Sequence, residues 1–244
     1  MKGYREDLAY VHDAGFRDYA LNAAPGLLRA FKRNGITGGL VIDLGCGSGR
    51  WARELNEAGY EVLGVDQSSA FIRLARTIAP HARFVNASLF RVSLPACVAV
   101  TSIGECLSYA FDPEAGKKEL LGLFERVNRA LAPGGIFIFD VATPERIPDN
   151  GPGRKWFAGA DWTILVETDG NRKQHTLTRK IICFRKRGRQ YRRSEEIHRL
   201  NLYRDREIVE MLQEVGFEAE RLAAYGRFRL PAGIAAFLAR KTAS

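Results

Sequence analysis

Short apolar segments alternate with segments of helical periodicity through the first 142 residues. Each apolar segment is short and rich in Val, Ile, Leu or Phe, as buried parallel strands are. The stretches between them place apolar residues three and four positions apart, which is typical of amphipathic helices. Strands that alternate with helices predict a doubly wound parallel sheet. The five predicted strands are residues 40–44, 62–65, 83–85, 98–103 and 136–141.

The pattern changes in the second half of the chain. Longer segments separated by Asp-Gly-Asn and Arg-Gly-Arg turns predict an antiparallel meander. We therefore expect an α/β fold: a doubly wound, seven-stranded, mostly parallel sheet with an antiparallel C-terminal hairpin, plus a three-stranded antiparallel insertion. The meander strands are residues 161–168, 174–184 and 191–203, a helix follows at 205–215, and the hairpin pairs 217–225 with 234–238.

These elements divide the chain into three parts. The helical pattern of residues 1–39 predicts an N-terminal lid. Residues 40–144 together with 205–244 are expected to form the α/β core. Residues 145–204 are expected to form the antiparallel insertion.

The composition is that of a globular protein, with 46% apolar and 27% charged residues. The N-terminus lacks the apolar stretch of a secretory signal, and the longest apolar runs fall far short of the ~20 residues that span a membrane. The cysteines form no CxxC pair, which predicts buried thiols and no metal site. We therefore expect a cytoplasmic protein without a membrane partner. The cysteines are Cys46, Cys97, Cys106 and Cys183.

Positive charge is concentrated in one segment. Residues 170–206 contain 13 Lys and Arg but only three Asp and Glu, whereas the remaining residues nearly balance. The net charge of +9 therefore belongs to the predicted insertion. Such a segment attracts anionic small molecules or a nucleic acid backbone, and a solvated outer face is the alternative.

A glycine-rich turn follows the first predicted strand, where Asp43 precedes Gly45, Gly47 and Gly49. Such a turn lets a ligand approach the backbone closely, because no Cβ atom stands in the way. The third glycine of a dinucleotide-binding fingerprint is missing, since Arg50 stands at that position. By itself the turn fits a ligand site and a purely structural turn equally well.

Two carboxylates favour a ligand site. Asp43 lies inside an apolar strand, and a buried carboxylate is costly unless it is paired or hydrogen-bonded. Asp66 ends the next strand, where a carboxylate can accept both hydroxyls of a ribose. A helix N-cap is the alternative for Asp66 alone. Together with the turn, the two acids predict a nucleoside-binding site.

The acid followed by GxGxG, the turn at residues 64–68 and the segment 131–135 resemble class I S-adenosylmethionine-dependent methyltransferases over about residues 40–142. The resemblance implies a methyltransferase whose cofactor is S-adenosylmethionine, with the glycine turn on its aminoacid part and Asp66 on its ribose. The implied cofactor-binding residues are Asp43, Gly45, Cys46, Gly47, Gly49, Asp66, Gln67, Asn86, Ser88, Leu89, Ser102, Ile103 and Gly104.

One position departs from the family's pattern. The family often carries an acid after the third strand to receive the adenine amine, but this chain has Ser88 there. The hydroxyl of Ser88 or the amide of Asn86 is a weaker acceptor than a carboxylate. The resemblance therefore leaves the adenine contacts open.

Methyl transfer from a sulfonium depends mainly on holding the nucleophile close and excluding water, and a base is needed only when the acceptor arrives protonated. Glu105 and Tyr109 follow the fourth strand and are the candidate catalytic residues. Insertions after the fifth strand usually cover the active site in the resembling family. Arg179 and His198 of the insertion are therefore candidate substrate-binding residues, and so is His12 of the N-terminal helical region, which is placed to cover the site from above.

These observations predict methyl transfer to a small acceptor that is anionic or polar. An RNA methyltransferase that uses residues 170–206 as its nucleic acid surface is the alternative, because clustered arginines with interleaved aromatic residues suit RNA. A cofactor-binding protein without catalytic activity is a third reading, since a fold alone does not establish a reaction.

Overall fold

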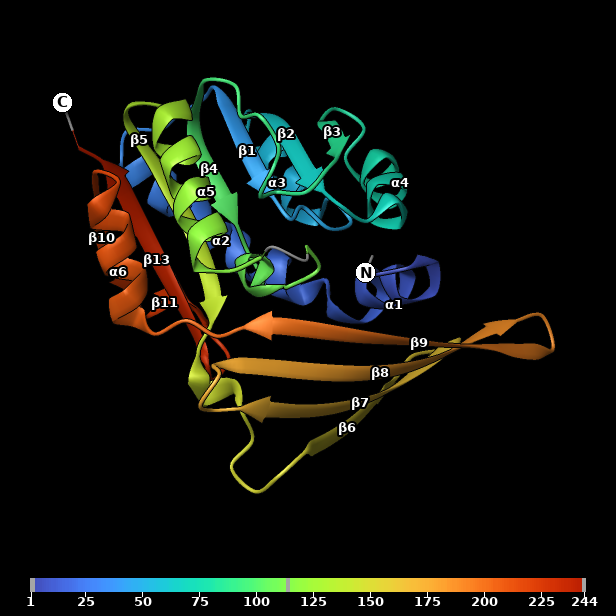
Figure 1. Cartoon of the computed structure of the whole chain (residues 1–244). Helices are drawn as coiled ribbons and strands as arrows, with labels where there is room; N and C mark the ends of the chain where they lie inside the picture. The colour runs from blue at the N-terminus through green and yellow to red at the C-terminus, as the bar shows by residue number, and fades with distance from the viewer. Residues whose placement is uncertain (1–2, 113–114, 243–244) are drawn as a thin grey trace.

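The computed structural model describes residues 3–112 and 115–242, so the outermost residues of the predicted lid and core, 1–2 and 243–244, lie outside it. The larger sheet consists of β1 (Leu40–Leu44), β2 (Glu61–Asp66), β3 (Arg83–Asn86), β4 (Cys97–Ser102), β5 (Leu131–Ala142), β10 (Phe217–Leu222) and β13 (Ile234–Lys241). Its order is β10-β13-β5-β4-β1-β2-β3 (Figure 1). β1 to β5 run parallel, and β13 runs antiparallel to both of its neighbours. The predicted seven-stranded α/β sheet is confirmed.

Each face of this sheet is covered by helices, because successive side chains of a strand point to opposite faces. Ile42 and Leu44 of β1 pack in one core with α5 (Lys117–Ala130) and α6 (Asp205–Glu214). Val41 packs in a second core with α2 (Asp18–Arg33) and α3 (Arg50–Glu57). α4 (Ser69–Ile78) packs against α3 and β3. In sheets layered in this way, ligands bind at the carboxyl ends of the strands, which here are the ends of β1, β2 and β4.

The insertion forms a second sheet with one strand more than the sequence predicts. Its order is β6-β7-β8-β9, with every neighbouring pair antiparallel. The strands are β6 (Gly153–Ala158), β7 (Trp162–Asn171), β8 (Thr176–Arg187) and β9 (Gln190–Asn201). β6 was not expected because its residues are almost all exposed, so the apolar alternation of a half-buried strand is missing. Figure 1 shows this sheet beyond the carboxyl ends of the parallel strands.

The N-terminal region forms two helices rather than one continuous pattern. α1 (Glu6–Phe16) and α2 meet at Arg17. α1 lies between the larger sheet and the second sheet and packs against α4 and β8 (Figure 1). Charged bonds hold it on both sides: Asp13 accepts bonds from Arg50, and Asp7 pairs with Arg192 of β9. The helix therefore joins the two sheets over the ligand-binding edge.

None of the described helices is long and apolar enough to cross a lipid bilayer. Within residues 3–112 and 115–242, no cluster of three or more His, Cys, Asp and Glu side chains is placed to hold a metal ion. The four cysteines are free thiols.

Candidate active site

A cavity of about 590 Å³ lies between the carboxyl ends of β1, β2 and β4 and one face of the second sheet. α1 contributes part of its wall through His12 and Phe16, and β8 contributes Arg179 and Ile181. Most of the residues predicted from the sequence come together here. Those that line the cavity are Asp43, Gly45, Cys46, Gly47, Asp66, Gln67, Ser88, Leu89, Ile103, Gly104, Glu105, Tyr109, His12 and Arg179.

The glycine turn is closed at its back and open toward one side. Gly45, Gly47 and Gly49 all have positive φ, the region in which side chains are strained. A Cβ on Gly45 would lie 2.6 Å from the side chain of Cys106, and one on Gly49 would lie 3.0 Å from Ala75. A Cβ on Gly47 would meet nothing within 4 Å. The turn therefore needs glycine for packing at its ends and leaves the backbone of Gly47 accessible.

Asp66 holds the turn in place. Its Oδ2 accepts the N–H of Gly47 at 3.0 Å, and its Oδ1 accepts the N–H of Ser68 at 2.8 Å. Loss of hydration in this enclosed position raises the pKa of Asp66 to about 6, although the two N–H groups act in the opposite direction. Each oxygen keeps acceptor capacity for a ligand hydroxyl.

Asp43 is a second carboxylate under the same wall. The hydroxyl of Thr101 donates to its Oδ1 at 2.9 Å, and Trp51 Nε1 in turn donates to Thr101 at 3.1 Å. Burial raises the pKa of Asp43 to about 7; the bond from Thr101 lowers it, and the charge of Asp66 raises it further. A bound cation would relieve both carboxylates, because opposite charge favours the ionised form.

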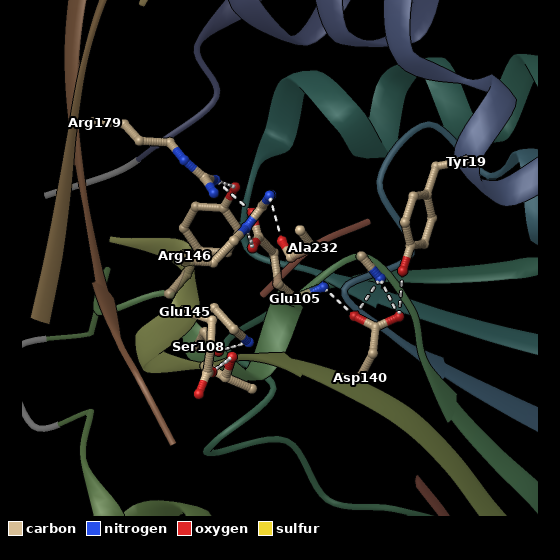
Figure 2. Close-up of polar contacts among 12 residues, drawn as sticks. Tyr19, Glu105, Ser108, Asp140, Glu145, Arg146, Arg179 and Ala232 are labelled. Carbon is tan, nitrogen blue, oxygen red and sulfur yellow. Dashed lines mark hydrogen bonds and ion pairs between the residues drawn. The ribbon is translucent and has the colours of Figure 1, made fainter. Parts of the chain in front are cut away.

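The cavity wall also carries two arginines that share one carboxylate (Figure 2). Glu105 is 6% exposed, and its Oε1 accepts a bond from Arg179 while its Oε2 lies 3.3 Å from Arg146 Nε. Burial alone would raise the pKa of Glu105, but the two guanidinium groups outweigh it and lower the pKa. Glu105 is thus held as an ionised partner of the arginines, which makes it a weak base.

An aromatic cluster borders Arg179. The hydroxyls of Tyr109 and Tyr4 are 2.8 Å apart, and Arg179 Nη1 lies 3.3 Å from the hydroxyl of Tyr109. Burial raises the pKa of Tyr109 to about 12, so its hydroxyl stays protonated. His12 packs edge-on against the ring of Tyr4, and burial lowers the pKa of His12 to about 4. His12 is therefore neutral at physiological pH.

Three of the predicted cofactor contacts lie outside the cavity wall. Gly49 is the residue before α3 and faces α4. The side-chain amide of Asn86 donates to the carbonyl oxygen of Asp66 at 2.9 Å. The hydroxyl of Ser102 is buried and donates to the carbonyl oxygen of Leu44 at 2.8 Å. The side chains of Asn86 and Ser102 therefore support the backbone beside the wall, and Gly49 packs against α4.

His198 also lies behind the wall rather than on it. It is 1% exposed, and its Nε2 is 2.9 Å from Oε2 of Glu196. Glu196 in addition accepts the backbone N–H groups of Tyr4 and Arg5 at 2.7 and 2.8 Å. The pair therefore ties β9 to the start of α1, which places His198 away from the position expected of a substrate contact.

Many residues of the cavity wall were not among the predictions, and three of them carry polar groups that bear on the site. Tyr4 reaches the wall from the segment before α1, Asp112 from the loop after β4, and Arg146 from the 3₁₀ turn after β5. Asp112 Oδ2 accepts a bond from the hydroxyl of Ser88 at 2.5 Å, which puts a carboxylate beside the position where the family's acid is missing. Only Arg146 had a usable signal, since it follows the carboxyl end of a parallel strand.

Known proteins are similar to this chain in sequence and in fold. Residues 41–135 match a family model described as a methyltransferase domain. The chain is 26% identical over 193 residues to a Bacillus subtilis (strain 168) protein that carries the name methyltransferase YqeM, and the match covers 76% of each chain. Residues 41–135 are therefore a methyltransferase domain, and the chain as a whole is similar to S-adenosylmethionine-dependent methyltransferases.

Solved structures of methyltransferases have the same architecture as this chain. An S-adenosylmethionine-dependent methyltransferase from Clostridium acetobutylicum ATCC 824 has a TM-score of 0.83 at 17% identity, over 96% of this chain and 98% of that chain. The sugar N-methyltransferase KedS8 from Streptoalloteichus sp ATCC 53650 has a TM-score of 0.78 at 19% identity, over 100% of this chain and 95% of that chain. At these identities the likeness establishes the fold.

The cavity of the methyltransferase suits the chemistry of this cofactor. S-adenosylmethionine carries a sulfonium and an ammonium group, and the glycine-turn side of the cavity carries the carboxylates of Asp43 and Asp66. The open backbone at Gly47 lies between the turn and Asp66, where a ligand can approach without meeting a side chain. One wall of the cavity therefore combines negative charge, opposite to the cations of the cofactor, with an accessible backbone.

The raised pKa values of the two carboxylates predict how cofactor affinity depends on pH. Only an ionised Asp66 can accept both ribose hydroxyls, and its pKa is about 6 in the free protein. Affinity for S-adenosylmethionine is therefore expected to rise with pH, and the ionisation of Asp66 alone makes it about tenfold weaker at pH 5 than at pH 7. Isothermal titration at constant ionic strength measures this. An affinity that is unchanged or higher at pH 5 would contradict the assignment, and Asp66→Asn should flatten the profile.

Proposed function

We propose that this methyltransferase methylates a small acceptor molecule that carries an anionic group. The observation behind the proposal is the pair Arg146 and Arg179, which share the single carboxylate of Glu105 in the cavity. Two guanidinium groups against one carboxylate leave a surplus of positive charge, and guanidinium recognises carboxylates and phosphates through paired bonds. The volume of about 590 Å³ is in the range of small-molecule sites.

In this proposal the two walls of the cavity have separate tasks. The glycine turn with Asp43 and Asp66 holds S-adenosylmethionine, which supplies an electrophilic methyl group when bound. Arg146 and Arg179 hold the anionic group of the acceptor on the opposite wall. α1 and the second sheet exclude water from the space between, and this closeness of the reactants accounts for most of the acceleration.

The side chains beside the arginines favour an acceptor atom that is nucleophilic without a strong base. Glu105 has a lowered pKa, His12 has a pKa of about 4, and Tyr109 keeps its proton because its pKa is about 12. A neutral amine meets this condition, since it attacks with its lone pair and loses its proton to water only afterwards. The likeness in fold to the sugar N-methyltransferase KedS8 supports an amine as acceptor.

The basic segment itself offers less free charge than its composition indicates. Asp7 pairs with Arg185, Arg187 and Arg192, each within 3.5 Å. Arg179 points into the cavity toward Glu105. Arg179 and Arg185 are thus largely buried inside the chain and are not available to a nucleic acid backbone, which favours the small-molecule proposal over the RNA alternative.

Transfer of a labelled methyl group tests the proposal. The protein is incubated with methyl-labelled S-adenosylmethionine and with metabolites separated by anion exchange, alongside the RNA and protein fractions of the same extract. We expect the label in a retained, low-molecular-weight fraction, and expect Arg179→Gln to abolish that transfer, whereas Arg193→Gln, on the exposed end of β9, keeps it. Label in the unretained fraction contradicts an anionic acceptor, and label in RNA supports the alternative.

A further inference from the structure

A carboxylate beneath the cavity has no part in the site described so far. Asp140 lies near the carboxyl end of β5 and is 0% exposed. Both of its oxygens accept the backbone N–H of Gly104, at 3.0 and 3.1 Å, and its Oδ1 also accepts the N–H of Glu105 (Figure 2). Its Oδ2 accepts the hydroxyls of Tyr19 at 2.9 Å and Tyr225 at 2.8 Å.

All four of these groups donate, so the arrangement requires Asp140 to be an ionised acceptor. Burial raises the pKa of Asp140, while the two N–H groups and the two tyrosine hydroxyls act against that rise. A carboxylate so deeply buried is tolerated only when its oxygens are hydrogen-bonded. Its four donors come from three separate parts of the chain: the turn after β4, α2, and β11 (Ala224–Tyr225).

The backbone that Asp140 binds is in a conformation that needs support. Gly104 has φ +94°, and Glu105 has φ +56° and ψ +24°, which is left-handed. Residues other than glycine rarely adopt this region, because their Cβ crowds the following carbonyl oxygen. Two successive N–H groups in such a turn converge into a concave anion site. Here the anion is the side chain of Asp140.

This turn decides where the carboxylate of Glu105 points. From it, Glu105 reaches Arg179 on β8 and Arg146 after β5 (Figure 2). Arg146 is steadied further by the carbonyl oxygen of Ala232, 3.2 Å from its Nη1. If the turn relaxed to an ordinary backbone conformation, the carboxylate would leave its place between the two guanidinium groups.

We propose that Asp140 is a positioning residue for the acceptor side of the site. It holds the turn at Gly104 and Glu105, and through Glu105 it sets the positions of Arg146 and Arg179. Through Tyr19 it also joins this turn to α2, whose N-terminal part lines the cavity. The inference rests on the proposed function in treating the arginines as the acceptor site, but the link from Asp140 to Arg179 is tested without any acceptor.

The test compares the wild type with Asp140→Asn, which keeps the shape but replaces one acceptor oxygen by a donor. Hydrogen exchange followed by mass spectrometry reads the amides of Gly104 and Glu105, and phenylglyoxal modification reads Arg179. We expect exchange at the turn to be faster by about tenfold or more, as for the loss of one charge-assisted bond, and Arg179 to react several-fold faster. Two internal controls are expected to stay unchanged: the amides of α5, and Arg50, whose partner is Asp13.

A merely structural role would speed up exchange in α5 and modification of Arg50 by the same factor as at the turn. That outcome overturns the proposal, as does a folded Asp140→Asn in which neither the turn nor Arg179 changes. If the variant does not fold, two further measurements decide. In the wild type the amides of Gly104 and Glu105 must exchange far more slowly than unbonded ones. In Tyr19→Phe the turn must stay protected while the first turn of α2 loses protection, because the Oδ1 bonds of Asp140 remain.

Discussion

Asp66→Ala is expected to weaken the binding of S-adenosylmethionine by at least about 100-fold. The substitution removes the carboxylate that accepts the N–H groups of Gly47 and Ser68, and with it the acceptor for the ribose hydroxyls. Each hydrogen bond to a charged group contributes about 1.5–3 kcal/mol, so the loss of two ligand bonds accounts for two orders of magnitude or more. Isothermal titration at pH 7.5 measures the dissociation constant.

A matched variant separates this effect from damage to the strand. Glu61 is the first residue of the same strand, β2, and is exposed. Glu61→Ala is expected to bind the cofactor as the wild type does. Thermal unfolding of both variants shows whether the sheet is intact. A folded Asp66→Ala that loses less than about threefold in affinity would be incompatible with a ribose bound at this carboxylate, since even one charged bond contributes more.

Arg179→Met is expected to lower the free energy of unfolding by about 3 kcal/mol at pH 7, the cost of breaking a buried ion pair on one side. Glu105 is 6% exposed and would keep only Arg146, which lies at 3.3 Å and is itself partly exposed. Urea denaturation measures the difference between variant and wild type.

The same loss is expected to shrink as the pH falls. In the wild type the pKa of Glu105 is lowered, so its stabilising contribution is present above the unfolded-state pKa and is lost as the pH falls through the folded-state pKa. In Arg179→Met the burial of Glu105 acts with less opposition and raises its pKa, so the side chain takes up a proton at mildly acidic pH. The variant and the wild type therefore converge toward pH 4.

Two controls show whether the effect comes from the ion pair. Arg193→Met removes an exposed arginine of β9 that pairs with Glu195, and the unfolding midpoint should not change. The double variant Arg179→Met with Glu105→Gln removes both charges and should recover most of the loss, because no carboxylate is left buried without a partner. A loss of the same size at pH 4.5 and pH 7, or no recovery in the double variant, would show that Arg179 acts through packing alone.

The fold and the cofactor wall were predictable because their signals are local in the sequence. The apolar runs of the parallel strands and the turn from Gly45 to Gly49 lie within a few residues of one another, and Asp66 follows at the end of the next strand. Strand order at the carboxyl edge then brings these parts together without further information. The second sheet was predicted in outline, but β6 carries no alternation and was missed.

The acceptor wall depends on contacts between distant parts of the chain. Tyr4 is held by Glu196, which is 192 residues away, and the position of Arg179 depends on Glu105, which is 74 residues away. No spacing or periodicity records such pairs. His198 shows the same limit: its place in the predicted insertion makes it a candidate substrate contact, but only the packing of α1 determines that it is buried behind the cavity wall.

A missing acid was likewise replaced from another part of the chain. The sequence has Ser88 where the resembling family often has a carboxylate, and this left the adenine contacts open. The loop after β4 brings Asp112 to the hydroxyl of Ser88, so a carboxylate lines the cavity there after all. This carboxylate comes from the loop after β4, and the segment after β3, where the family's pattern has its acid, gives no sign of it.

A crystal structure with S-adenosylhomocysteine tests most directly where this chain holds its cofactor and where the acceptor meets it. We expect electron density for the ribose hydroxyls on Asp66, with the sulfur atom facing the wall that carries Glu105 and Arg179. Density elsewhere in the molecule, or a ribose turned away from Asp66 with the sulfur directed to solvent, would contradict it.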